Sequence, residues 1–276
     1  GSDDVIDATM RAFANSGDRI VASTPTFSMV GTFARLNGLE LMSVPLTEQY
    51  DVDPERLVST RAKITYLCTP NNPTATALSR DAVEYVVAHA SGVVLLDEAY
   101  AEFASETFVD LVRRYDNLLV TRTFSKAFGL AGLRVGYGGG STALVGLVQR
   151  ARGPYKVNAF AERAALASLD ETDDALEWVR VHAALAAVNR DRLGTALTSL
   201  DLAPLPSAAN FVFVPTADAD AIARGLRERD VLIRAFAGLP VELSCLVTSN
   251  GKALRIGVGP WEMMQRLLEA VAEVLA

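Results

Sequence analysis

Short apolar runs alternate with amphipathic stretches through the first half of the chain. The runs are rich in Val, Ile and Leu, which indicates buried strands, and several of the stretches between them repeat apolar residues with the helical period. Strands are predicted over residues 19–23, 40–44, 64–68, 93–96, 118–121 and 134–138, and helices over 27–36 and 80–89 among others. This alternation is typical of a mostly parallel sheet covered by helices on both faces.

The pattern changes after residue 155. Residues 161–169 and 175–200 are rich in Ala and Leu and predict helices, and a smaller mixed portion follows. Its predicted elements are strands over 210–214, 231–234 and 253–258 and helices over 219–229 and 262–275. We therefore predict an α/β fold with a large domain over 1–172, a connecting helix over 173–200 and a small α/β domain over 201–276.

The composition of the chain bears on which partners and ligands the protein can bind. Half of the residues are apolar and the net charge is −7, with no basic stripe in the sequence. These features argue against nucleic acid or an anionic membrane as the main partner, although a small anionic ligand needs only a few local cations. Two cysteines without a disulfide pattern favour the cytoplasm, and the two histidines, in separate helical patterns, do not predict a metal site.

Polar clusters follow three neighbouring predicted strands. TPNNPT follows the strand over 64–68, DEAY follows 93–96, and RTFSK follows 118–121. Ligands of open parallel sheets bind outside the carboxyl ends of the strands. The three clusters would therefore bring an amide, an acid with a phenol, and an amine to one rim of the sheet.

This combination fits pyridoxal phosphate. A lysine in a pocket can lose its proton and attack an aldehyde, and Lys126 is one of only four lysines in the chain. A carboxylate such as Asp97 would keep the ring nitrogen of the cofactor protonated. Asn72 and Tyr100 would bind the ring hydroxyl.

The phosphate of such a cofactor needs cations and N–H donors. Arg134, the Ser125 hydroxyl and the helix that begins at residues 1–3 could supply them. Each residue alone also fits a structural role, because NNP is a common turn and an Asp-Glu pair can cap a helix. The prediction rests on their occurring together at these strand ends. The run GYGGG lacks the dinucleotide-binding spacing and is interpreted as a turn into a helix capped by Ser141.

With these residues in place, the chain resembles the fold-type I pyridoxal-phosphate aminotransferases, and most closely the histidinol-phosphate aminotransferase family. The resemblance runs through nearly the whole chain. It rests on the motifs GSDD (1–4), PTF (25–27), PNNPTAT (70–76), DEAYAEF (97–103), RTFSKAFGLAGLRVGY (122–137), PYKVN (154–158), PSAANF (206–211) and LRIGVG (254–259). The family fold has a large domain with a mostly parallel sheet of the seven-stranded type and a small C-terminal α/β domain.

The resemblance also implies roles for single residues. Lys126 resembles the lysine that forms the Schiff base with the cofactor and moves the substrate's proton, Asp97 the partner of the ring nitrogen, and Tyr100 and Asn72 the partners of the ring hydroxyl. The phosphate-binding residues implied are Ser2, Asp3, Thr123, Ser125 and Arg134, and Phe27 stands where the family has an aromatic residue stacked on the ring.

Arg255 resembles the arginine that binds the acidic end of the substrate, with Arg234 and Asn72 assisting. The implied reaction is transamination between histidinol phosphate or imidazole acetol phosphate and glutamate or 2-oxoglutarate, in a cytoplasmic homodimer. An aminotransferase for aromatic or other amino acids, a lyase similar to threonine-phosphate decarboxylase, and an inactive fragment or heterodimer partner remain alternatives.

Three residues differ from the family pattern: Phe27 replaces a tyrosine, Ala75 a glycine, and Lys156 an asparagine. The family also carries an N-terminal segment before GSDD, with an arm over the active site and a tyrosine that reaches the neighbouring subunit. The resemblance leads us to expect that this segment is absent from the chain.

Overall fold

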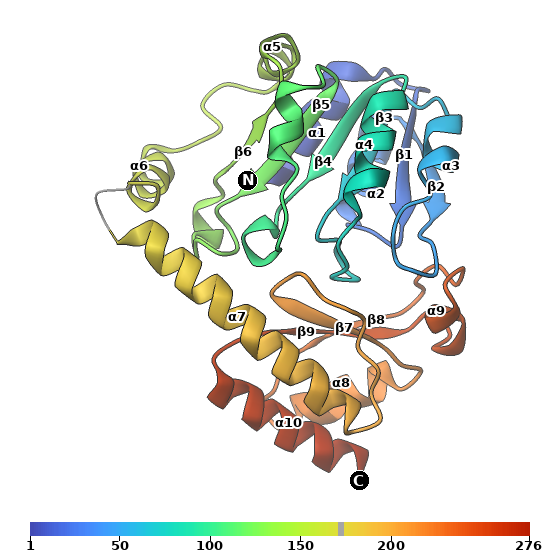
Figure 1. The fold of residues 1–276 in the computed structure, drawn as a ribbon, viewed down its shortest axis with the longest axis vertical. Coiled ribbons are helices and arrows are strands. Elements are labelled where there is room, and N and C mark those ends of the chain that lie inside the picture. The colour runs from blue at the N-terminus through green and yellow to red at the C-terminus, as the bar shows by residue number, and fades with distance from the viewer. Residues whose placement is uncertain (171–173) are drawn as a thin grey trace.

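A computed structural model describes residues 1–170 and 174–276 (Figure 1). Its main element is a six-stranded sheet with the strand order β2-β1-β3-β4-β5-β6. The first five strands in the chain are parallel, and β6 is antiparallel to β5. The strands are β1 (Arg19–Thr24), β2 (Glu40–Pro45), β3 (Ile64–Cys68), β4 (Val93–Asp97), β5 (Leu118–Thr123) and β6 (Gly136–Gly139).

Helices cover both faces of this sheet. On one face, α1 (Ser2–Phe13), α2 (Met29–Leu36) and α5 (Thr142–Ala151) enclose an apolar cluster with inward residues of the strands. On the other face, α3 (Pro54–Ser59) and α4 (Arg80–His89) enclose a second cluster. Because both faces are buried, the central strands need apolar residues at every position, which explains their continuous apolar runs.

The second half of the chain forms a three-stranded antiparallel sheet with the order β7-β9-β8. Its elements are α6 (Ala159–Ser168), α7 (Ala175–Thr198), β7 (Phe211–Pro215), α8 (Ala219–Arg227), β8 (Arg234–Phe236), α9 (Ser244–Thr248), β9 (Ala253–Gly257) and α10 (Trp261–Leu275). One face of this sheet packs on α7, α8 and α10. The opposite face contributes Phe213 and Ala253 to the same apolar cluster that α3 and α4 cover, so the two sheets share a core (Figure 1).

The predicted α/β architecture is confirmed, with shifted boundaries. The described residues form six strands of the large sheet, where the resemblance implied the seven-stranded type. The strand predicted from residue 134 begins at Gly136, because Arg134 has a left-handed backbone (φ 55°) that ends the preceding turn. The strand predicted over 231–234 begins only at Arg234, as β8, which is an edge strand of the small sheet paired with β9. The domain boundaries stay a prediction, and residues 171–173 lie outside the described part.

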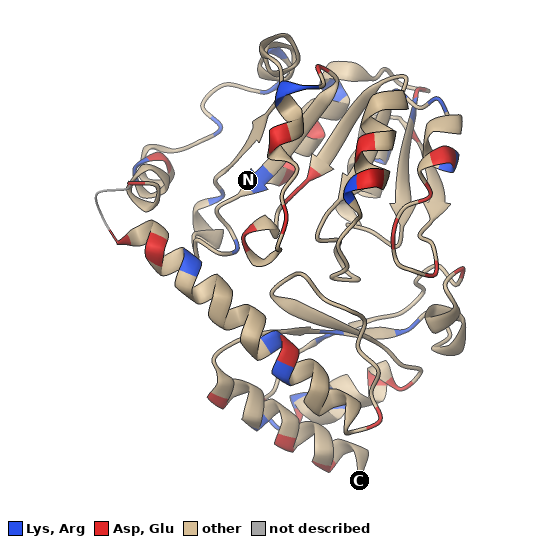
Figure 2. Ribbon diagram, viewed as in Figure 1, with Lys and Arg blue, Asp and Glu red and all other residues tan. Residues whose placement is uncertain are grey.

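Charged residues avoid the middle of the large sheet. Figure 2 shows the strands largely without Lys, Arg, Asp or Glu, and β3, β4 and β5 carry charge only near their carboxyl ends, at Asp97 and Arg122. A buried charge needs a partner or a function, so these two residues mark the edge where chemistry can occur. Over the same described residues, no helix is both long and apolar enough to cross a bilayer.

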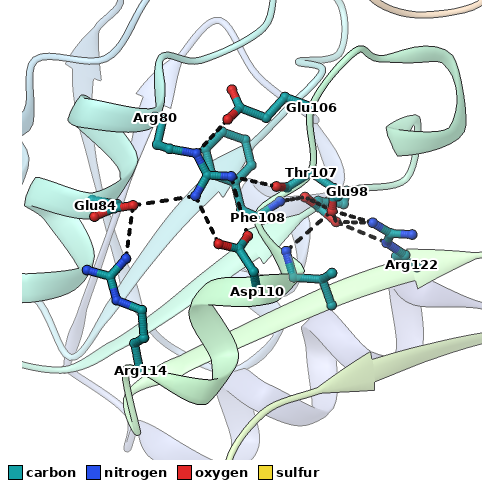
Figure 3. A network of polar contacts seen from close by, with 10 residues as sticks. Arg80, Glu84, Glu98, Glu106, Thr107, Phe108, Asp110, Arg114 and Arg122 are labelled. Atoms are coloured by element: carbon teal, nitrogen blue, oxygen red, sulfur yellow. Dashed lines mark hydrogen bonds and ion pairs between the residues drawn. The ribbon is translucent and has the colours of Figure 1, made fainter.

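A buried ion pair connects the carboxyl ends of β4 and β5. Glu98 follows β4 and is 1% exposed, and its carboxylate accepts hydrogen bonds from Arg122 on β5, from the Thr107 hydroxyl and from the Phe108 N–H (Figure 3). The Glu98–Arg122 distance is 2.7 Å. The pair therefore ties the ends of β4 and β5 together and holds the loop that follows β4 against them.

We expect Arg122→Met to lower the free energy of unfolding by about 3–5 kcal/mol, because it leaves the Glu98 carboxylate buried without its cation. Arg114→Met is the matched control, since Arg114 pairs with Glu84 at 3.3 Å on a half-exposed surface. Its expected cost is about 0.5 kcal/mol. Urea unfolding of the two apoproteins measures both values, and equal losses would contradict a special role for the buried pair.

Candidate active site

The carboxyl ends of the parallel strands surround a cavity of about 280 Å³. Residues from α1, three strand ends, and β9 of the small sheet contribute to its wall. The lining residues are Ser2, Asp3, Phe27, Cys68, Asn72, Asp97, Ala99, Tyr100, Thr123, Ser125, Lys126, Arg134 and Arg255. The cavity thus brings together every predicted site residue except Arg234.

Lys126 lies in the turn that follows β5. The turn is closed by a hydrogen bond from the Gly129 N–H to the Lys126 carbonyl, and Gly129 has a φ of 69°, which suits glycine. The Lys126 Nζ lies 5.1 Å from the centroid of the Tyr100 ring. Among the described residues, no carboxylate lies within ion-pair distance of this amine. The amine is therefore held near the cavity without a fixed acidic partner.

Asp97 ends β4 and is 3% exposed. Its carboxylate accepts hydrogen bonds from the Tyr66 hydroxyl at 2.8 Å, the Ala99 N–H at 3.1 Å and the Thr121 hydroxyl at 3.3 Å. All three donors are neutral, and burial raises the pKa of Asp97 from its ordinary 3.8 to about 6. A buried acid with neutral partners is suited to receive a cationic N–H from a ligand.

Arg255 reaches the cavity from the small sheet. Its guanidinium donates to Asn72 Oδ1 at 3.2 Å and to the Tyr100 hydroxyl at 3.1 Å. The same group lies 3.8 Å from the centroid of the Phe211 ring, which holds it flat. Arg255 therefore joins the two sheets at the site and presents a positive charge beside Asn72 and Tyr100.

A cluster of one arginine and two hydroxyl side chains lies at the N-terminus of α1. Arg134 donates to the Ser125 hydroxyl at 3.4 Å and pairs with Asp3 at 3.1 Å, and Thr123 donates to Ser125 at 2.9 Å. Ser2 begins α1 and is buried. A helix N-terminus next to an arginine and two hydroxyls is suited to a phosphate group.

Gly136 allows this close packing. A Cβ at this position would lie 2.6 Å from the Ser2 backbone nitrogen and 2.8 Å from the Arg122 carbonyl oxygen. Both are backbone atoms that cannot turn aside, so a larger residue would push the start of α1 away from β6. The first glycine of the GYGGG run is thus explained by its close packing against the start of α1.

Three further residues that the sequence singled out do not line the cavity. Arg234 is opposite Arg255 in the β8–β9 register, but it is exposed and its guanidinium lies 5.3 Å from the Phe236 ring. Lys156 forms an ion pair with Asp4 at 3.0 Å and lines a neighbouring cavity. Ala75 is buried with a φ of 66°, a conformation in which glycine is more common.

Sequence reasoning missed the residues behind the cavity wall. Tyr66 and Thr121 hold Asp97, and Phe211 supports Arg255. Tyr66 could have been found from its spacing. It lies two residues before Cys68, the last residue of the strand, so both side chains point to the same face of the sheet. Over the residues described, no group of three His, Cys, Asp or Glu side chains could hold a metal ion.

Comparison with known proteins agrees with this site. Residues 1–271 match the family described as aminotransferase class I and II. The histidinol-phosphate aminotransferase of Roseiflexus castenholzii is 40% identical over 284 residues, with 99% of this chain and 73% of that protein covered. The protein of the same name from Desulfitobacterium hafniense is 35% identical, with 100% of this chain and 76% of that protein covered.

Solved structures give the same result. A putative histidinol-phosphate aminotransferase from Erwinia carotovora atroseptica has a TM-score of 0.87 at 28% identity and covers 99% of this chain and 79% of its own. The histidinol-phosphate aminotransferase from Sinorhizobium meliloti, solved in complex with pyridoxal-5'-phosphate, has a TM-score of 0.86 at 27% identity, with 100% and 75% covered. The predicted resemblance is confirmed, and the chain belongs to the class I and II aminotransferase family.

Proposed function

We propose that this chain catalyses pyridoxal-phosphate-dependent transamination between histidinol phosphate and 2-oxoglutarate, and the reverse reaction through imidazole acetol phosphate and glutamate. The observation that carries the proposal is the cavity with Lys126, the buried acid Asp97 and the Arg134 cluster around its wall. The relatives named histidinol-phosphate aminotransferase, which this chain matches over about three quarters of their length, support the choice of substrate.

The residues present fit the cofactor. Asp97 is a buried acid whose donors are all neutral, so it can accept the N–H of a protonated ring nitrogen. Asn72 and Tyr100 offer polar atoms to the ring hydroxyl, and Phe27 offers an aromatic face. The phosphate group matches the cluster at the N-terminus of α1, formed by Ser2, Asp3, Thr123, Ser125 and Arg134.

When bound, pyridoxal phosphate supplies an aldehyde for covalent attachment of the amino group and a ring that withdraws electrons from the substrate Cα. Lys126 supplies the amine that holds the cofactor and, once released, takes the proton from the substrate Cα and returns it. Asp97 keeps the positive charge on the ring nitrogen. Tyr100 lies under the Lys126 amine and orients it.

Arg255 binds the acidic end of each substrate. Its guanidinium can form paired hydrogen bonds with a carboxylate or a phosphate, and Phe211 holds it in place. One positive group then serves glutamate and histidinol phosphate in turn. Arg234, one strand away, adds positive charge near this end.

We infer further that the protein acts as a homodimer in the cytoplasm, with a large domain over 1–172, a connecting helix over 173–200 and a small domain over 201–276. The resemblance to the aminotransferases supports the dimer, and two free cysteines support a reducing compartment. The position of Arg255 on the small sheet supports a site built between the two domains.

Replacing Lys126 tests the central assignment. We expect Lys126→Ala to abolish the change in cofactor absorbance that glutamate causes in the wild-type holoenzyme, because no other amine in the cavity can move the proton. Lys252→Ala is the control, since Lys252 pairs with Asp220 on the surface. Full activity of the Lys126 variant would refute the assignment.

The same assay with a series of amino donors tests the substrate. We expect a faster absorbance change with histidinol phosphate and glutamate than with aromatic amino acids. A preference for aromatic donors would favour the broader aminotransferase alternative. Release of CO₂ instead of an oxo acid would identify a lyase.

We expect Arg255→Ala to raise the KM for glutamate and for histidinol phosphate together, by roughly 10- to 100-fold, because each loses a charged hydrogen bond. Arg229→Ala is the control, since Arg229 pairs with Glu273 on the outer side of the small sheet. Steady-state kinetics measures both variants. An effect on only one of the two substrates would contradict the shared anion site.

The pKa of Asp97 predicts a pH-dependent stability of the apoprotein. Because its folded pKa of about 6 lies above its ordinary 3.8, the folded state binds the extra proton between these values. The contribution of Asp97 to stability is therefore lost as the pH rises from about 4 to about 6. We expect Asp97→Asn to gain stability relative to the wild type across that window and to keep a constant advantage above it, measured by urea unfolding. A difference that does not change with pH would contradict the raised pKa.

A further inference from the structure

A buried tyrosine lies directly behind the proposed cofactor site. Tyr66 is on β3, is 1% exposed, and packs in the apolar cluster that α1, α2 and α5 cover. It does not line the cavity. A phenylalanine would fill the same space, so the packing of the ring does not account for the hydroxyl.

The hydroxyl contacts the acid of the site. Tyr66 Oη donates a hydrogen bond to Asp97 Oδ2 at 2.8 Å, while Ala99 and Thr121 donate to the other oxygen, Oδ1. The register between β3 and β4 makes this possible. Tyr66 is paired with Leu95 and Cys68 with Asp97, so the long phenol extends along the strand to the carboxylate two residues further on.

We propose that Tyr66 is a positioning residue for the reaction: its hydroxyl orients the Asp97 carboxylate and stabilises its negative charge, so that Asp97 can accept the ring N–H of the cofactor. This inference rests on the proposed function, because it assigns Tyr66 a role through Asp97. Tyr66 itself touches neither substrate nor cofactor.

The negative charge of Asp97 needs stabilisation because its buried surroundings favour the protonated acid. The pKa of Asp97 is raised to about 6, mainly by burial and to a smaller extent by the nearby Asp3 carboxylate on α1. The Tyr66 hydroxyl on β3 and the Thr121 hydroxyl on β5 lower the pKa. The Cys68 thiol, also on β3, is fully buried and its own pKa is raised, so it stays neutral. Of the groups that lower the pKa of Asp97, the Tyr66 hydroxyl has the largest effect.

The two carboxylate oxygens of Asp97 accept hydrogen bonds from different donors. Each carboxylate oxygen has two acceptor sites, so the three hydrogen bonds from the protein leave room for a fourth donor. With Oδ2 bound to Tyr66 and Oδ1 bound to Thr121 and Ala99, the carboxylate cannot rotate. Loss of the Tyr66 hydroxyl would free Oδ2 and favour protonation, and a protonated Asp97 cannot accept the ring N–H.

The test uses Tyr66→Phe and pyridoxamine 5'-phosphate, which binds without a covalent bond to Lys126. Calorimetry of the apoprotein between pH 6 and pH 9 gives the affinity at each pH. For a rise of about one unit in the pKa of Asp97 from its value of about 6, we expect the variant to bind roughly fivefold more weakly than the wild type at pH 6 and roughly twofold more weakly at pH 7. The difference should narrow as the pH rises, because Asp97 then ionises in both proteins.

Two controls separate this role from packing. Tyr50→Phe removes a phenol hydroxyl on the opposite face of the large sheet, beside Cys245, and should leave the affinity unchanged at every pH. In an Asp97→Asn background, Tyr66→Phe should cause no further loss, because the carboxylate it acts on is gone. Circular dichroism of all variants checks that each is folded.

Tyr66→Phe binding as tightly as the wild type over the whole pH range would overturn the proposal. An equal loss in the wild-type and Asp97→Asn backgrounds would also overturn it, because the effect would then come from packing. If Asp97→Asn weakens binding while Tyr66→Phe does not, only the role of Tyr66 fails. Failure of the wild-type protein to bind pyridoxamine 5'-phosphate would overturn the proposed function and this role with it.

Discussion

The site depends on one buried negative charge. Asp97 ends a central strand with 3% of its surface exposed and has only neutral hydrogen-bond donors. Elsewhere on the same edge, the protein neutralises a buried acid with a cation, as Arg122 does for Glu98. The two adjacent acids therefore differ: Glu98 has a cationic partner within the protein, whereas Asp97 has none among the described residues and lines the cavity. An acid left without a cation at the mouth of a cavity is suited to a positively charged ligand.

The sheet explains why two adjacent acids can differ so much. Successive side chains of a strand point to opposite faces. Asp97 follows Leu95 on the face covered by α1, where the cavity opens, whereas Glu98 turns toward the loop after β4 and its partner on β5. The Glu98–Arg122 pair fixes the ends of β4 and β5 relative to each other (Figure 3). It thereby also fixes the distance between Asp97 and the turn that carries Lys126.

Sequence reasoning located the strands and the residues at their ends, because both are local signals. Ile64–Cys68 is a mostly apolar run, Asp97 ends its strand, and Asn72 and Lys126 lie within four residues after theirs. It could not show the contacts that depend on strand register and tertiary packing, and so it missed Tyr66. The contact of Tyr66 with Asp97 depends on the β3–β4 pairing, and that of Arg255 with Asn72 joins residues 183 positions apart. Likewise, the sequence predicted that Arg234 assists Arg255, but of these two arginines Arg255 alone lines the cavity.

Arg255 also links the cavity to the packing of the two sheets against each other. It belongs to the small sheet, yet its partners Asn72 and Tyr100 follow strands of the large one. Its neighbours along β9 and β7, Ala253 and Phe213, lie in the apolar cluster that both sheets share. The position of Arg255, the charge that we propose binds the substrate, therefore depends on the apolar contact between the sheets as well as on its hydrogen bonds to Asn72 and Tyr100. A small shift in that contact would move Arg255 relative to Lys126 while leaving the hydrogen bonds around Asp97 in place, because those bonds come from residues of the large sheet and its loops alone.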